Sequence, residues 1–286
     1  MAFTSIRFTP RVLTLFLSVL CFPISTLCAR PGDVEKHRVN FGELASALDT
    51  GMRTAGVKSV TVADFLGTDG RSSDLTRYIS GKLSDALRKD IADSNGPRFV
   101  SRAALADSKL TIEEMNSPEA LARTGAVWGV AAIVTGTVEI SPDKYVVKAT
   151  VRSVAEGSVL LAASQDIPHL RILDLLLPGG LSQEGAPVKT VGADGVMAPA
   201  CEYCPMPQYS EDARAAKIQT AKVTLIVTVS TKGEAIKVAL TKDPGFGLGE
   251  KAIEDVSEWK FRPATQNGKP VTVAVPVDIE FKLSRT

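Results

Sequence analysis

The feature that most constrains this chain is an alternating run near its end, residues 271–283. The even positions are Thr, Ala, Pro, Asp, Glu and Lys, whereas every odd position is apolar: Val271, Val273, Val275, Val277, Ile279, Phe281 and Leu283. A period of two predicts a half-buried strand, because successive side chains of a strand point to opposite faces. Pro276 has no N–H, so it belongs at a sheet edge or a bulge. We therefore expect an edge strand, to which another chain can add a strand.

The residues before this run predict the rest of a small domain. Alternating apolar residues indicate a hairpin of strands 223–229 and 236–240, joined by a turn at 231–234. A short amphipathic helix follows from Leu248 to Trp259, and Asn267-Gly268 is a strong signal for a second hairpin turn. The expected fold is α+β: a three-stranded antiparallel sheet with helices on one face.

The same pieces, in this order, closely resemble the TonB C-terminal domain family over residues 205–283. The residues that carry the resemblance are Pro207, Tyr209, Ala213, Gly233, Trp259, Phe261, Pro263 and Gly268. In that family the domain is periplasmic and captures a short segment of an outer-membrane transporter by strand addition. The resemblance thus implies a protein partner in the envelope, with such a transporter as one candidate. In the plain structural alternative, Tyr209, Trp259 and Phe261 only fill the core.

Partner binding is expected along the final strand. The inward set Val273, Val275, Val277 and Ile279 should be core, and the residues predicted to meet a partner are Val271, Thr272, Ala274, Pro276, Asp278 and Glu280. Pro276 leaves two alternatives open. It tolerates an open edge, or it blocks that edge against pairing.

Residues 1–29 predict a cleaved secretory signal. Arg7 and Arg11 precede an apolar stretch that is shorter than the ~20 residues of a spanning helix. A lipoprotein site is disfavoured because Leu27 precedes Cys28; an uncleaved anchor remains the alternative. The prediction is a periplasmic protein that reaches a membrane only through partners or an uncleaved signal. Energy-transducing TonB proteins keep a membrane anchor and a proline-rich spacer, so coupling to an inner-membrane motor is in doubt here.

Residues 40–166 predict an α/β domain with a strand, a long helix, a short strand, helices and a three-strand meander. This resembles the secreted domains of the FlgO and CsgG N-terminal type, also found at the front of TolB. The resemblance rests on Val60-x-Val62-x-Asp64-Phe65, Leu83-x-x-x-Leu87, Phe99-Val100-x-Arg102, Gly125-x-x-x-Gly129 and Ile133-Val134-x-Gly136. Those relatives are structural or assembly parts of the envelope. A purely structural role is therefore an alternative.

Between the two domains, residues 167–200 are rich in Pro and Gly and predict a semi-flexible linker, with residues 170–177 apolar enough for one short helix. The second domain then spans 201–286. A hydrophobic fraction of 44% suits two cores, and a net charge of +1 gives no argument for nucleic acid.

The residue patterns predict no enzyme, no cofactor and no metal site. His37 and His169 lie in segments that look like tails or linkers. The glycines at 245, 247 and 249 follow a hairpin, whereas a dinucleotide site needs a parallel strand. Asp64, Asp69 and Asp74 are explained by a solvated loop and a helix cap.

Cys201-x-x-Cys204 is the one motif with chemistry of its own. The pair would be the only cysteines of a chain without its signal, in an oxidising compartment. Pro205 follows it and no helix begins there, so the context of a reactive thiolate is missing. Two cysteines cannot complete a four-ligand zinc site. We expect a structural disulfide, and a thiol–disulfide enzyme remains the alternative function.

Overall fold

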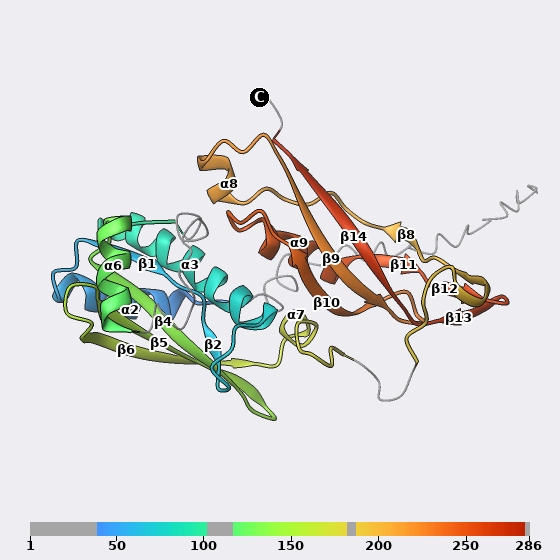
Figure 1. Cartoon of the computed structure of the whole chain (residues 1–286), viewed down its shortest axis with the longest axis horizontal. Coiled ribbons are helices and arrows are strands. Elements are labelled where there is room, and N and C mark those ends of the chain that lie inside the picture. Colours follow the sequence, from blue (N-terminus) through green and yellow to red (C-terminus); the bar gives the residue numbers. More distant parts are fainter. Residues whose placement is uncertain (1–38, 102–116, 182–186, 284–286) are drawn as a thin grey trace, which may run out of the picture. The chain divides into compact units, whose positions relative to one another are not determined.

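The computed structural model describes residues 39–101, 117–181 and 187–283 (Figure 1). The predicted signal at 1–29 and the helical segment expected around Ala103 lie outside the described residues. Residues 37–286 belong to one compact unit that holds two main sheets.

The first sheet is mixed, with strand order β3-β1-β4-β5-β6 and β2 (Leu66–Gly67) paired to β4. β1 (Ser59–Val62) runs parallel to β3 (Arg98–Phe99) on one side and to β4 (Ala132–Ile140) on the other. β4, β5 (Lys144–Ser153) and β6 (Val159–Pro168) form an antiparallel meander. The predicted strand and meander order is confirmed.

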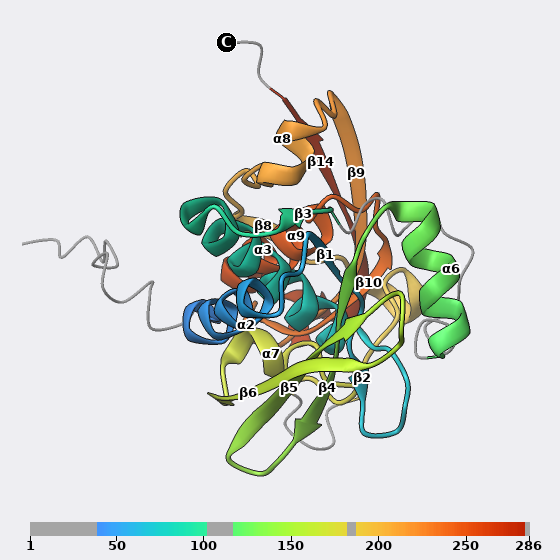
Figure 2. The ribbon, with the colours of Figure 1, turned by 90° about the vertical axis from the view of Figure 1, so that its left-hand side faces the viewer.

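Helices cover both faces of this sheet (Figure 2). α2 (Gly42–Thr54) and α3 (Asp74–Ser94) lie on one face, and α6 (Pro118–Trp128) lies on the other. Ser73 caps α3 by accepting from the Thr76 N–H, and the predicted stripe of that helix is buried: Leu75, Ile79, Leu83, Leu87 and Ile91. Leu121 of α6 belongs to a second apolar cluster with Ile133. The spacing of apolar residues along the helices therefore explains why helices pack on both faces of this sheet.

The second sheet is antiparallel with the order β10-β9-β14, as predicted. Its strands are β9 (Thr220–Val229), β10 (Ala235–Lys242) and β14 (Val273–Lys282). α8 (Glu211–Ala215) precedes them, and α9 (Leu248–Glu258) packs on β9 and β10 through buried Ala252, Ile253 and Val256. The α+β class and the hairpin between β9 and β10 are confirmed.

The prediction of one unbroken strand over 271–283 is wrong at Thr272. β12 (Ala264–Gln266) and β13 (Lys269–Val271) form a separate hairpin around Asn267 and Gly268, whose φ angles are 50° and 76°. Positive φ at both central residues is the signature of a type I′ turn. Val271 pairs with Ala264, so the chain changes partners before β14 begins. Thr272 at this change is buried, with 6% of its surface exposed.

The stretch 167–200 also differs from the expected linker in its described part. It contains the short helix α7 (Arg171–Asp174), the 3-10 turn η1 (Ala193–Gly195), β7 (Val196–Met197) and the start of β8 (Ala200–Tyr203). β7 pairs with β12, and β8 pairs with β11 (Lys260–Arg262). The short helix expected within 170–177 is present, and its apolar residues are buried: Ile172, Leu173, Leu175 and Leu176. Their burial accounts for the packing of a stretch whose Pro and Gly content predicted flexibility.

A buried carboxylate links α3 to α9. Glu254 Oε1 lies 2.7 Å from Lys82 Nζ, and its Oε2 lies 2.9 Å from Lys251 Nζ. Burial raises the pKa of Glu254, but the two ammonium groups outweigh burial and hold that pKa below its usual value. The carboxylate is therefore charged at neutral pH and stays in its pairs.

Candidate partner-binding edge

β14 is an edge strand that pairs only with β9 in its sheet. The Leu283 N–H donates to Gln219 O at 3.0 Å, and the register continues from Lys282 opposite Thr220 to Val273 opposite Val229. Because backbone direction alternates along a strand, the odd residues of β14 point their N–H groups at β9 and the even residues point theirs away. The outward donors are those of Ala274, Asp278, Glu280 and Lys282.

Pro276 falls in the even set, opposite Ile226. Its missing N–H is an outward one, so the proline removes no hydrogen bond to β9. It separates Ala274, which lies beside the Lys189 bridge, from the run 278–282. The edge therefore keeps a continuous set of outward N–H groups after the proline.

The opposite edge of the same sheet is covered by the chain itself. The Val238 N–H donates to Leu175 O at 2.9 Å, and the Leu181 N–H donates to Ile236 O at 2.6 Å. Arg171 donates to Ala235 O at 2.7 Å. Residues 171–181 thus occupy the outward backbone groups of β10 from Ala235 to Val238, and Asp74 accepts from the Leu240 N–H at 2.9 Å. A strand from a partner would find them already bonded.

One residue of the chain reaches the beginning of the β14 edge. The Lys189 N–H donates to Thr272 O at 2.8 Å, and Lys189 forms an isolated parallel bridge with Val273. In a parallel bridge of this register, Lys189 O faces the Ala274 N–H, so the chain itself occupies that first outward donor. The available outward donors are therefore those from Asp278 to Lys282.

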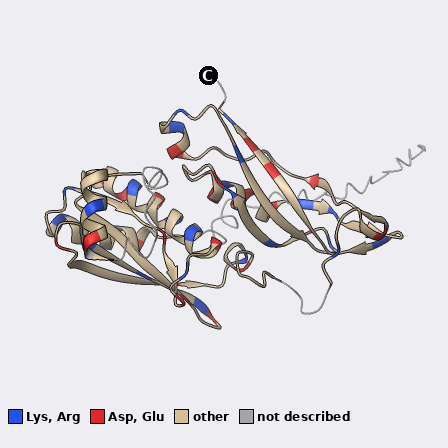
Figure 3. Cartoon of the chain, viewed as in Figure 1, with Lys and Arg blue, Asp and Glu red and all other residues tan. Residues whose placement is uncertain are grey.

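Acidic and basic residues lie along the end of β14 and the neighbouring β9 (Figure 3). Asp278 pairs with Lys222 Nζ at 2.8 Å and accepts from Thr224 Oγ1 at 2.8 Å. The Lys222 hydrogen bond, followed by that of Thr224, holds the pKa of Asp278 below its usual value. Glu280 pairs with Lys282 at 3.1 Å. Each of these carboxylates is paired with a lysine, so this face has no single sign of charge.

Of the six residues predicted to meet a partner, four lie on this edge strand and are exposed: Ala274, Pro276, Asp278 and Glu280. Val271 lies in the β12–β13 hairpin, and Thr272 is buried. In the inward set Val273 and Ile279 are core, whereas Val275 and Val277 are only half-buried. Lys282 and Lys189 were missed. The alternation of the strand pointed to Lys282, but nothing in the sequence pointed to Lys189.

The residues of the family motif mostly hold the domain together. Tyr209 donates to Ile218 O at 2.6 Å and meets Phe281 edge to face, with ring centroids 5.8 Å apart. Ser210 caps α8 by accepting from the N–H of buried Ala213. Trp259 and Phe261 contact each other at 6.1 Å between ring centroids. These contacts match the structural alternative for the aromatic residues.

Only glycine fits at position 233, because of its backbone angle and its close contact with Phe261. Its φ is 76°, and a Cβ built there would lie 1.8 Å from Phe261 O. The same approach lets the Phe261 N–H donate to Gly233 O at 2.9 Å. The remaining motif residues lie on strands or turns: Pro207 precedes α8, Pro263 separates β11 from β12, and Gly268 completes the I′ turn.

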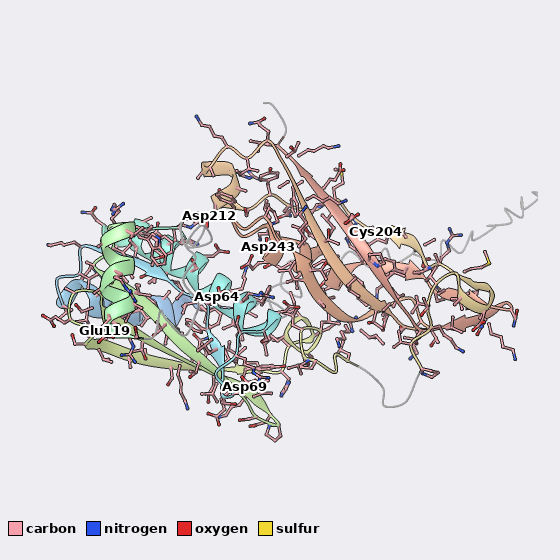
Figure 4. All side chains as sticks on the ribbon, viewed as in Figure 1. Asp64, Asp69, Glu119, Cys204, Asp212 and Asp243 are labelled. Atoms are coloured by element: carbon pink, nitrogen blue, oxygen red, sulfur yellow. A yellow bond between two sulfur atoms is a disulfide. The ribbon has the colours of Figure 1, made fainter. Side chains whose placement is uncertain are left out.

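Cys201 and Cys204 form the expected disulfide, with their Cα atoms 6.0 Å apart (Figure 4). Cys201 lies in β8 opposite Phe261, and Cys204 directly follows that strand. The bond therefore ties the end of β8 to the chain that enters the matched domain.

Acidic and histidine side chains gather at no metal-binding site within the described part of the chain. The Asp69 carboxylate accepts from the Arg71 N–H at 3.0 Å, and Asp74 accepts from the Leu240 N–H at 2.9 Å. Asp69 is thus bonded within its own loop, whereas Asp74 bonds the backbone of β10 and Ser73 is the residue that caps α3. Across the described ranges, no helix is long and apolar enough to span a membrane.

Together these features define an α+β domain with one covered and one available sheet edge. The family model described as Gram-negative bacterial TonB protein C-terminal matches residues 205–283. This confirms the resemblance predicted from the sequence over that segment, which is less than half of the chain. None of the curated proteins matches the chain.

Solved structures of envelope proteins show distant similarity. The LpoB C-terminal domain from Escherichia coli is 10% identical, covering 46% of this chain and 100% of that one, with a TM-score of 0.34. The lipoprotein GNA1162 from Neisseria meningitidis is 16% identical, covering 39% and 81%, with a TM-score of 0.30. The TonB C-terminal domain of Pseudomonas aeruginosa is 18% identical, covering 34% and 96%, with a TM-score of 0.27. At these scores, no property of these proteins is carried over to this chain.

Proposed function

We propose that this chain is a non-catalytic periplasmic adaptor that captures a protein partner of the envelope by strand addition to β14. The observation that carries the proposal is the difference between the two edges of one sheet. β10 has its outward groups bonded to residues 171–181 and to Asp74, whereas β14 keeps outward N–H groups from Asp278 to Lys282. Backbone hydrogen bonds to such an edge supply affinity, and alternate side chains supply specificity.

The family match over residues 205–283 supports the class of partner. Domains of that family capture an extended segment of an outer-membrane transporter, and this is the candidate partner here. The predicted signal at 1–29 supports a periplasmic location. The exposed side chains of Asp278 and Glu280 lie along the open edge and would contact side chains of the partner.

The direct test is a titration of the isotopically labelled chain with a synthetic peptide. The peptide is the periplasm-facing N-terminal segment of an outer-membrane transporter. We expect amide shifts at Asp278, Glu280 and Lys282 and none along β10. Shifts confined to residues 39–166, or no shift along β14, would contradict strand addition.

A matched pair of variants isolates the backbone donor. Asp278→Pro removes one outward N–H, and Asp278→Asn keeps it at the same exposed position. Loss of one hydrogen bond of about 1 kcal/mol predicts roughly five-fold weaker peptide binding for the proline variant than for the asparagine variant. Both variants should melt at similar temperatures, because both lose the pair between Asp278 and Lys222. Equal affinities of the proline and asparagine variants would remove the role assigned to this donor.

A further inference from the structure

β6 is an edge strand of a different kind from β14. It is the last strand of the first sheet and is ten residues long, whereas the opposite edge strand β3 has two residues. At about 3.4 Å per residue, β6 offers an edge of roughly 30 Å. Its side chains alternate between a face under α2 and an exposed face. The edge is therefore long and regular.

The devices that protect natural edges are sparse on β6. Charges, prolines and bulges normally discourage an edge strand from pairing with another chain. Residues 159–165 read Val-Leu-Leu-Ala-Ala-Ser-Gln, with neither charge nor proline. The protective residues Asp166 and Pro168 stand at the far end, and the bulge between Val151 and Arg152 disturbs only the first residues.

Large apolar side chains are exposed at the same strand. Val159 is 53% exposed and Leu160 is 37% exposed. Ala162 and Ser164 continue the exposed face with small uncharged groups. By contrast, β14 carries Pro276 and alternating charges, and β10 is covered by residues 171–181. Of the long edges in the described structure, β6 is thus the one with an apolar, unprotected centre.

We propose that β6 pairs with β6 of a second copy of this chain, antiparallel about a two-fold axis perpendicular to the sheet. A two-fold of this kind places each residue opposite one of the same face, so Leu160 and Ala162 meet small or apolar partners. The only ionisable side chain of β6 is Asp166, which pairs with Lys144 of its own chain at 2.7 Å. Pairing centred on Ala162 therefore opposes no like charges, which makes the strand complementary to itself.

The expected dimer is weak. Two ten-residue strands alone bury less than the ~1,600 Å² of a standard interface, so the dimer should dissociate on dilution. Two copies joined in this way carry two β14 edges, so a partner with two extended segments gains avidity. This pairing uses only the first sheet and does not depend on the proposed role of β14.

Sedimentation of the exported protein over a wide concentration range tests the pairing. We expect the mean mass to rise toward twice that of one chain, and Ala162→Lys to stay monomeric at every concentration. Ala274→Lys, on the other edge strand, is the matched control and should dimerise like the wild type. A wild type that remains monomeric throughout would overturn the proposal, as would unaltered self-association of Ala162→Lys.

A second measurement guards against misfolding of the lysine variant. In a wild-type background, Ala162→Cys should form an intermolecular disulfide on mild oxidation, because it lies near the proposed two-fold axis. Ala274→Cys should remain monomeric under the same conditions. Cross-linking at Ala274 but not at Ala162 would also overturn the proposal.

Discussion

The hydroxyl of Tyr145 donates a hydrogen bond to Asp174 Oδ1 at 2.5 Å, joining β5 to α7. Burial, and then this bond, raise the pKa of Tyr145 well above its ordinary value, so the hydroxyl stays a donor at neutral pH. His169 Nδ1 lies 2.7 Å from the same Asp174 oxygen, and its Nε2 lies 3.0 Å from Ser141 O. Both ring nitrogens face acceptors, which favours the doubly protonated ring.

The first prediction concerns pH. The hydrogen bond to Asp174, then that to Ser141 O, raises the pKa of His169 above its ordinary value of about 6.5, and Asp143 adds to the effect. A raised pKa in the folded state means that the contribution to stability is complete below about pH 6.5 and is lost as pH rises through the folded pKa. The unfolding free energy of the wild type should therefore exceed that of His169→Gln most at low pH. Urea unfolding of both proteins across this range checks it.

Asp174→Asn is the companion variant, because it removes the carboxylate and keeps the size of the side chain. The His169 pKa should fall toward its ordinary value in this variant, as followed by imidazole resonances. A wild-type advantage that grows with rising pH would contradict the assignment.

The second prediction compares two glycines that share a φ of 76°. Gly268→Ala should cost about 1–2 kcal/mol for the left-handed backbone alone, because nothing lies within 4 Å of the added Cβ. Gly233→Ala should cost about 1–3 kcal/mol more, because its Cβ would overlap Phe261 O at 1.8 Å. Thermal unfolding of both variants measures the difference. Equal losses would show that the backbone near Gly233 moves away freely.

The third prediction separates two inward valines of β14. Val273 is fully buried, so Val273→Ala should lower the unfolding free energy by about 2 kcal/mol. Val277 is half-buried, and Val277→Ala should cost about 1 kcal/mol or less. Denaturant titrations of the two variants provide the comparison. A larger loss at Val277 would mean that a further contact buries this end of the edge.

The fourth prediction concerns the disulfide between Cys201 and Cys204. The closed loop is short, so the double serine variant should lose less than the ~3 kcal/mol that chain entropy gives for a 15-residue loop. Thiol labelling of the native protein should find neither cysteine free. Insulin-reduction assays should give no turnover. Robust turnover would favour the alternative of a thiol–disulfide enzyme.

Local pattern was enough to predict the main helices and strands of the two sheets, although not the short strands between residues 196 and 203. Three patterns reflect short-range geometry that each segment carries by itself. They are the alternation at 273–282, the apolar residues spaced four apart from Leu75 to Ile91, and the Asn267-Gly268 turn. The disulfide between Cys201 and Cys204 could be predicted for the same reason, since the two cysteines are three residues apart.

Only the tertiary structure decided which edges are available. Residues 171–181 cover β10, and Lys189 reaches Thr272, through backbone groups whose partners lie far away in the sequence. Every residue except proline carries the same backbone donor and acceptor, so these residues give no sequence signal for such bonds. The change of strand partner at Thr272 is also a tertiary effect. The alternating run 271–283 is divided there, because Val271 pairs within the β12–β13 hairpin and Val273 pairs with β9. Periodicity determined the strand, and long-range packing determined where it begins and what it leaves open.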